Sequence, residues 1–194
     1  MPVNRRIVLA ARPSGWPEES DFRLEQAPVP TPADGEVLVQ SLYLSVDPYM
    51  RGRMREQASY AAPQPLGETM LGGAVGRVVE SRSAKFRPGD IAVGMFGWQE
   101  WAAVAAEELS RFDFPGVPVS TALGVLGMPG LTAYFGLLDL CDPQPGQTVL
   151  VNAAAGAVGS VVGQIAKIRG CRAVGVAGSP AKVRHVIEDL GFDA

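Results

Sequence analysis

The sequence predicts an α/β protein in which a β-rich segment precedes the first part of a doubly wound parallel sheet. Three observations support this prediction. Short β-strand patterns occupy the residues up to about 112, helical patterns begin at Ser120, and a strand–turn–helix–strand unit covers residues 148–177. A proline- and glycine-rich segment, residues 114–118, separates the two parts. We therefore expect one domain of residues 1–118 and a second of residues 119–194.

The composition narrows the class of protein. A formal net charge of −3 disfavours a nucleic-acid partner, because no basic excess offsets the phosphate charge. Two cysteines and one histidine are too few for structural zinc, which takes about four such ligands, so we expect no metal. We interpret Cys141 and Cys171 as buried thiols of a reduced, cytoplasmic protein. Proline and glycine interrupt every long uncharged run, so we expect neither a membrane span nor a targeting segment.

The first part of the chain shows seven short β patterns. Their spacing is typical of a barrel or sandwich, and the triplet Pro88-Gly89-Asp90 between two of them predicts a turn with positive φ at the glycine. The expected strands are residues 6–11, 22–29, 36–46, 73–81, 90–96, 101–105 and 109–112.

The linking segment is helical in pattern. We expect a helix over residues 121–128, a break at Pro129-Gly130, and a second helix over residues 131–141. Leu131, Phe135 and Leu138 recur at helical spacing and predict its buried face.

The stretch of residues 148–159 is the centre of the second part. Thr148 to Val151 is apolar without alternation, which predicts a strand covered on both faces. The turn that follows reads Ala154-x-Gly156-x-x-Gly159 and lacks the first glycine of the dinucleotide-binding pattern G-x-G-x-x-G. Its small residues leave backbone amides open to a pyrophosphate at a helix N-terminus. A tight turn that only packs a helix on a strand is the alternative, and the surrounding strand–helix–strand order favours binding.

The helix after this turn, residues 156–169, should bury Val158, Val161, Val162, Ile165 and Ile168. Gly163 inside it costs about 1 kcal/mol relative to alanine, so we expect a close helix–sheet contact there. Residues 173–177 then form a second buried strand, which completes a right-handed βαβ unit.

The end of the second strand indicates which dinucleotide is bound. NAD sites usually place an acidic residue here, but this chain has Gly178-Ser179-Pro180-Ala181-Lys182. Ser179 fits a helix N-cap and Pro180 the first helical position. Lys182 would oppose the helix dipole unless a phosphate were bound nearby. We therefore expect Ser179 and Lys182 to hold the 2′-phosphate of NADP; the alternative is a solvated surface lysine.

The last helix should bury Val183, Ile187 and Leu190 and carry the exposed pairs Arg184–Glu188 and His185–Asp189. The single histidine is therefore expected at the surface rather than in a catalytic role.

Taken together, these stretches resemble the medium-chain dehydrogenase/reductase superfamily. More closely, they are similar to its zinc-independent branch of prostaglandin/leukotriene reductases, alkenal double-bond reductases and curcumin reductases. The matching stretches are residues 44–51, 127–137, 151–159, 164–167 and 178–182. Zinc-dependent relatives place a cysteine ligand near Asp47, where this chain has none. The resemblance implies a GroES-like domain followed by a Rossmann domain, with a small-molecule substrate between them.

The resemblance also implies a reaction and its residues. The reaction is NADPH-dependent reduction of the carbon–carbon double bond of α,β-unsaturated ketones or aldehydes, by a homodimer when full length. Tyr49 and Tyr60 would line the substrate pocket. Tyr49 is also a candidate donor to the enolate oxygen, with a turn-packing role as an equal alternative. The implied cofactor contacts are Thr132, Ala155, Gly156, Ala157, Val158, Gly159, Gly178, Ser179 and Lys182.

The chain departs from the family in length. It carries two strands of a sheet that usually has about six, so we expect a fragment that binds NADPH weakly and reduces nothing efficiently. Two alternatives stay open: a quinone reductase of the same superfamily, disfavoured by residues 47–51, and a non-catalytic nucleotide-binding or interaction protein.

Overall fold

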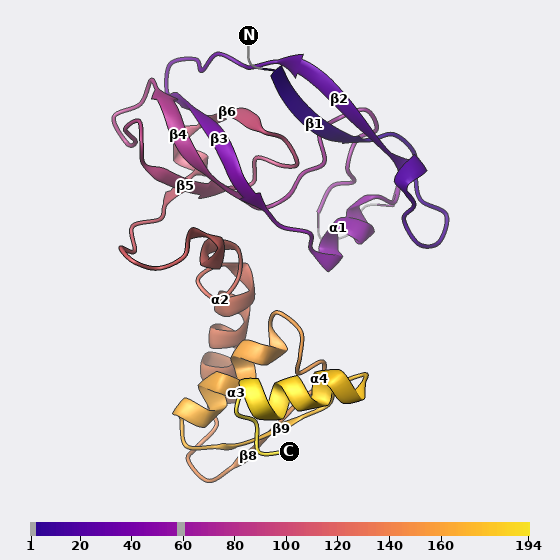
Figure 1. Ribbon diagram of the computed structural model, residues 1–194, viewed down its shortest axis with the longest axis vertical. Coiled ribbons are helices and arrows are strands. Elements are labelled where there is room, and N and C mark those ends of the chain that lie inside the picture. Colours follow the sequence, from indigo (N-terminus) through magenta and orange to yellow (C-terminus); the bar gives the residue numbers. More distant parts are fainter. Residues whose placement is uncertain (1–2, 58–60) are drawn as a thin grey trace. The chain divides into compact units, whose positions relative to one another are not determined.

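The computed structural model describes residues 3–57 and 61–194 of the chain. They form two compact units, Met1–Ser120 and Thr121–Ala194, and each unit is described by itself (Figure 1).

The first unit is built from antiparallel strands, as the short β patterns predict. Strands β1 (Val3–Leu9) and β2 (Phe22–Pro28) pair with each other, with the short helix η1 (Glu19–Asp21) between them. A five-stranded sheet has the order β6-β3-β4-β5-β7. Its strands are β3 (Glu36–Leu44), β4 (Ala74–Ser81), β5 (Ile91–Gly94), β6 (Trp101–Ala105) and β7 (Ser110–Arg111). Helix α1 (Pro48–Arg53) follows β3, and η2 (Ala106–Glu108) joins the last two strands.

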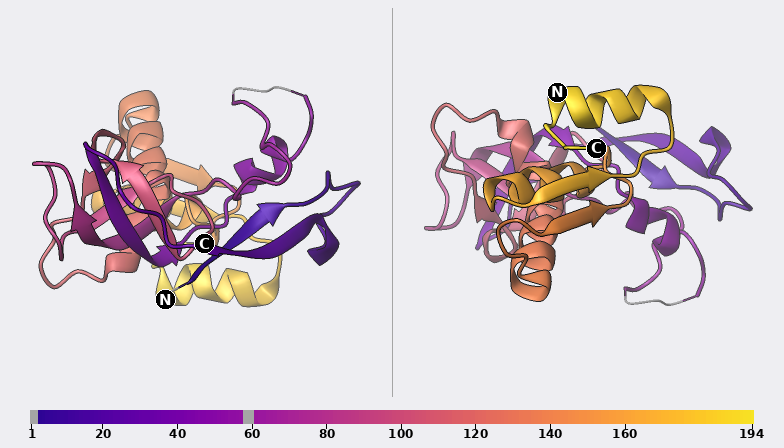
Figure 2. Two further views of the ribbon diagram at one scale, coloured as in Figure 1. Left: turned by 90° about the horizontal axis from the view of Figure 1, so that it is seen from above. Right: turned by 90° about the horizontal axis from the view of Figure 1, so that it is seen from below.

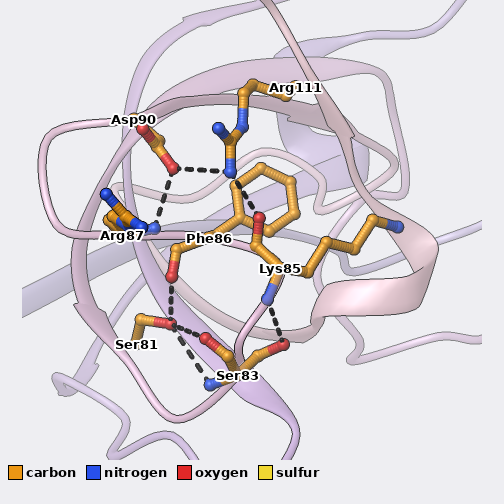
Figure 3. Close-up of polar contacts among 7 residues, drawn as sticks. All are labelled: Ser81, Ser83, Lys85, Phe86, Arg87, Asp90 and Arg111. Atoms are coloured by element: carbon orange, nitrogen blue, oxygen red, sulfur yellow. Dashed lines mark hydrogen bonds and ion pairs between the residues drawn. The ribbon is translucent and has the colours of Figure 1, made fainter.

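A buried aromatic ring belongs to the core of this sheet. Phe86 belongs to the core cluster formed with Val37, Val39 and Val78. Polar contacts fix the turn that carries it (Figure 3): the Ser81 hydroxyl donates to the Phe86 carbonyl at 2.8 Å, and Arg111 pairs with Asp90 at 3.0 Å. Gly89 has a φ of +97°, which confirms the predicted turn.

The second unit begins with helical segments. The short helix η3 (Val119–Leu123) crosses the boundary between the units, and α2 (Met128–Tyr134) continues as a π-helical turn, η4 (Phe135–Cys141). The expected helix over residues 121–128 was therefore wrong, and Pro129 does not break a helix. It lies in the first turn of α2, where its missing N–H has no helical acceptor to lose.

The βαβ unit is present and parallel. Strand β8 (Thr148–Val151) pairs with β9 (Arg172–Gly175) in the register Thr148↔Arg172 to Val151↔Gly175, and the two strands lie side by side (Figure 2). Helix α3 (Gly159–Ile168) connects them, and α4 (Pro180–Arg184) continues as a second π-helical segment, η5 (His185–Asp189).

Only one face of the β8–β9 pair is buried in this unit. Val151 and Ala173 face the core with Val186 and Phe192, whereas Leu150 is 70% exposed. The expectation of a strand covered on both faces was wrong, because α3 and η5 both contribute to the core on a single face.

The predicted helix stripes are confirmed in part: Leu138, Val162, Ile165 and Leu190 pack against the core, whereas other predicted members are exposed. Ile168 is 84% exposed, and Leu131, Phe135, Val183 and Ile187 are exposed as well. In η5 the buried residue is Val186. Cys171 is buried as expected, but Cys141 is exposed. In η4 and η5 the π-helical turns shift the residues that point inward, so helical periodicity did not identify those faces fully.

Candidate functional site

The carboxyl ends of β8 and β9 bring the two predicted cofactor segments to one edge. The turn after β8 begins at Asn152, and the segment after β9 contains Gly178 to Lys182. The amide of Ala154 donates to the carbonyl of Val176 at 3.0 Å, which joins the two segments directly. Ligands of open α/β sheets bind at this end of the strands, so the arrangement is that of a dinucleotide site.

The turn has a left-handed backbone conformation one residue before Ala154, which stands where the pattern has its first glycine. Ala153, not Ala154, has the left-handed conformation, with a φ of +48°. Ala154 is fully buried and contacts the backbone of β9 instead. A non-glycine residue in this region is strained by about 1 kcal/mol or more, and such strain often occurs at functional sites.

Four amides of the turn have no hydrogen-bond acceptor in the part of the chain that the structure describes. The N–H groups of Ala155, Ala157, Val158 and Gly159 donate to no acceptor within residues 3–57 and 61–194. Val158 is the N-cap of the ten-residue helix α3, so the amides lie where the helix dipole favours an anion.

A cavity of about 360 Å³ opens at this turn. Its lining is small and apolar apart from one residue, and Gly156 and Gly159 form part of it. A Cβ on Gly159 would lie 2.5 Å from the carbonyl oxygen of Ala153, so no side chain fits there. The lining residues are Leu150, Val151, Asn152, Ala153, Gly156, Val158, Gly159 and Val162.

The segment after β9 has the predicted cap. The Ser179 hydroxyl oxygen accepts a hydrogen bond from the backbone N–H of Lys182 at 3.3 Å, and Pro180 follows it in the first turn of α4. The Lys182 side chain is exposed and has no carboxylate partner among the described residues. Gly178 is exposed and offers open space at its Cα. The His185–Asp189 pair is confirmed, with 2.7 Å between Nδ1 and the carboxylate.

Sequence reasoning missed the residues that hold β9 from its other edge. The Asp193 carboxylate accepts from the Ala173 N–H at 2.7 Å and from the Lys167 ammonium at 2.6 Å. The hydrogen bond from Lys167, and then that from Ala173, lower the pKa of Asp193 below its ordinary value. The ring of Phe192 lies where a Cβ of Gly163 would be, so that glycine's close contact is with Phe192 rather than with the sheet.

The remaining predicted site residues belong to other segments of the chain. Thr132 is exposed on α2, and its hydroxyl donates to the Met128 carbonyl at 2.7 Å. Tyr49 belongs to the first unit, where its ring packs on the cluster of Leu9, Met50, Met54 and Met70 and its hydroxyl oxygen is buried. This burial favours the turn-packing interpretation of Tyr49 over the donor interpretation. Tyr60 lies outside the described residues.

No group of three or more histidine, cysteine, aspartate or glutamate side chains in the described residues could hold a metal ion. No helix in the described part of the chain is long and apolar enough to cross a membrane.

A β-rich unit followed by a βαβ unit with an amide-rich turn defines the fold of the medium-chain dehydrogenases and reductases. Residues 5–112 match the family described as the N-terminal domain of oxidoreductase. The chain belongs to this oxidoreductase family, and the resemblance drawn from its sequence is confirmed.

Several relatives are about 50% identical to this chain over the aligned residues. The NADPH-dependent curcumin reductase of Escherichia coli (strain K12) is 52% identical over 191 residues, which are 98% of this chain and 55% of that protein. Prostaglandin reductase 1 of Rattus norvegicus is 49% identical over 182 residues, 92% of this chain and 53% of that protein. The chain therefore spans about half the length of the curated relatives it matches.

A solved structure shows the same fold. The crystal structure of CurA in complex with NADPH from Vibrio vulnificus matches with a TM-score of 0.90 and 49% sequence identity, over 97% of this chain and 56% of that one.

Proposed function

We propose that this chain takes part in the NADPH-dependent reduction of the carbon–carbon double bond in α,β-unsaturated ketones or aldehydes. The observation that carries the proposal is the joined pair of segments at the end of β8 and β9. The first has four amides without a protein acceptor, and the second has an exposed lysine beside a capped helix start and no acidic residue. The identity with a curcumin reductase and a prostaglandin reductase supports the choice of reaction.

The residues of the second unit fit NADP(H) chemically. The amides of Ala155 and residues 157–159 would hold the pyrophosphate, since they have no acceptor among the described residues and lie at the start of α3. Ser179 and Lys182 would hold the 2′-phosphate beside Gly178, where an NAD site would need a carboxylate instead. We place Gly156 and Thr132 among the cofactor contacts on the resemblance alone. When bound, NADPH supplies a hydride for the β-carbon of the unsaturated carbonyl compound.

We assign substrate contacts to the first unit. In this proposal residues 1–118 form the substrate domain and residues 119–194 the first part of the cofactor domain. Reduction of an enone gathers negative charge on the carbonyl oxygen, which a nearby donor must stabilise. Tyr49 and Tyr60 are proposed as walls of the substrate pocket. The burial of the Tyr49 hydroxyl supports the role of a supporting wall for Tyr49 over that of the donor. A homodimer is proposed as the working form, on the resemblance.

The test is a comparison of ligands and acceptors with the purified chain. Binding of NADPH and NADH is measured by calorimetry, and NADPH oxidation is followed at 340 nm with an unsaturated ketone, with a quinone and with no acceptor. We expect NADPH to bind at least tenfold more tightly than NADH, and any oxidation to require the unsaturated ketone. Absent binding of both nucleotides would refute the cofactor assignment, and preferential oxidation by the quinone would move the chain to the quinone reductases.

A further inference from the structure

The cavity at the β8 turn contains one side chain whose role the proposed function leaves open. Asn152 directly follows β8 and is exposed. Among the described residues that line the cavity, it is the only one with a polar side chain, because the others are aliphatic residues, alanine and glycine. The usual dinucleotide pattern begins after this position, so the pattern assigns it nothing.

The carboxamide of Asn152 is available to a ligand. It makes no hydrogen bond to any residue that the structure describes. An asparagine side chain offers two N–H donors and one carbonyl acceptor. The next residue, Ala153, has positive φ and lines the same cavity, as do Val158 and Gly159, two of the residues whose amides have no acceptor among the described residues. Asn152 therefore adds side-chain donors at the entrance of a site made otherwise of backbone donors.

We infer that Asn152 is a cofactor-binding residue that donates a hydrogen bond to the pyrophosphate of NADP(H). The inference rests on the proposed function of this turn and adds a residue to it. The pyrophosphate is common to NADPH and NADH, whereas the 2′-phosphate is not. Asn152 therefore contributes equally to the affinity for both nucleotides, in contrast to Lys182, whose contribution is confined to NADPH.

Two substitutions test the inference in the 194-residue chain. Asn152→Ala removes the donors, and we expect NADPH and NADH to bind about five- to tenfold more weakly, by the same factor. Asn152→Asp keeps the shape but puts a negative charge beside the phosphates, so we expect a larger loss than for the alanine variant. Gln164→Glu is the matched control. It makes the same amide-to-acid change on the exposed side of α3, outside the cavity, and should leave both affinities within twofold of the wild type.

The readout is the dissociation constant of each nucleotide from calorimetry, with circular dichroism to confirm that each variant is folded. If Asn152→Ala binds both nucleotides as tightly as the wild type, the inference is overturned. In that case NADPH binding by the wild type still supports the proposed function. Asn152→Asp binding as tightly as the wild type would also overturn it, because a carboxylate serves a ribose hydroxyl but repels a pyrophosphate. A wild-type chain that binds neither nucleotide would overturn the proposed function and this inference together.

Discussion

The methyl group of Ala154 occupies the space that Gly175 leaves empty. A Cβ built on Gly175 would lie 2.9 Å from the Cβ of Ala154, and Ala154 is fully buried. The turn after β8 and the strand β9 therefore meet through one alanine and one glycine. The pattern has a glycine where this turn has Ala154. The space for the alanine methyl group comes from the absence of a side chain at Gly175 on the neighbouring strand.

This relationship predicts coupling between the two positions. Gly175→Ala should destabilise the chain by about 1–3 kcal/mol through overpacking, because Phe192 and Val186 also lie 2.9 Å from the added carbon. Adding Ala154→Gly should restore part of the loss. The measurement is the free energy of unfolding in urea for both single variants and the double variant. Gly178→Ala is the control, since nothing lies within 4 Å of its Cβ position. Strict additivity of the two changes would contradict the direct contact.

Lys182 should discriminate between the two nicotinamide dinucleotides. Lys182→Ala is expected to weaken NADPH binding about tenfold or more, because a charge-assisted contact to the 2′-phosphate is lost, and to leave NADH binding unchanged. Dissociation constants for both nucleotides provide the check. Arg184→Ala removes an exposed cation from the same helix and should affect neither. Equal losses of NADPH and NADH affinity in the lysine variant would remove its phosphate role.

Asp193 should make the stability of the chain depend on pH in the acidic range. Its pKa in the folded protein lies below the ordinary value of 3.8, chiefly because the Lys167 ammonium group donates to it. A lowered carboxylate pKa contributes stability that is present above the unfolded pKa and is lost as the pH falls through the folded pKa. Asp193→Asn should therefore be less stable than the wild type at pH 6, and the difference should shrink steadily below about pH 4.

Urea unfolding of the wild type and of Asp193→Asn across this pH range measures the effect. Lys167→Met should also reduce this pH dependence, because it removes the ammonium group that lowers the pKa of Asp193. A stability difference that stays constant from pH 6 to pH 2 would show that the carboxylate's charge is not involved.

Tyr49 should act through its ring. Tyr49→Phe keeps the packing on Met50 and Leu9 and is expected to change the free energy of unfolding by no more than about 1.5 kcal/mol. Tyr49→Ala leaves a cavity and should cost about 3–5 kcal/mol. Urea unfolding of both variants measures the difference. A loss of stability in Tyr49→Phe as large as that in Tyr49→Ala would show that the hydroxyl, and not the ring, carries the contribution.

The features that could be predicted from the sequence are those set by nearby residues. Strand β8, the Ser179 cap and the turn at Gly89 follow from local propensities and from backbone conformations that few residue types adopt. The two segments of the candidate site followed in the same way, because both lie directly after strands. Their joining by the Ala154–Val176 hydrogen bond then follows from parallel pairing.

The features that could not be predicted depend on contacts between distant residues. The exposure of Leu150 and Ile168 reflects which face the rest of the chain covers, and both residues have a perfectly ordinary apolar pattern. Asp193 and Phe192 are more than 15 residues from their partners on β9, and no local rule links them. Pro129 was expected to break a helix because the sequence does not show where α2 begins. In the first turn of a helix a proline is compatible with the helical backbone.

The position of Phe192 has a consequence for spectroscopy. Its ring fills the space above both Gly163 and Gly175, which belong to different elements of the second unit. The ring current of an aromatic side chain displaces the chemical shifts of protons that lie close to the ring. The α-protons of these two glycines should therefore have displaced shifts together whenever residues 192–194 are seated against β9, and return to ordinary shifts when that segment detaches. A pair of glycine signals thus reports, without any label on the protein, whether the outer edge of this sheet is in place.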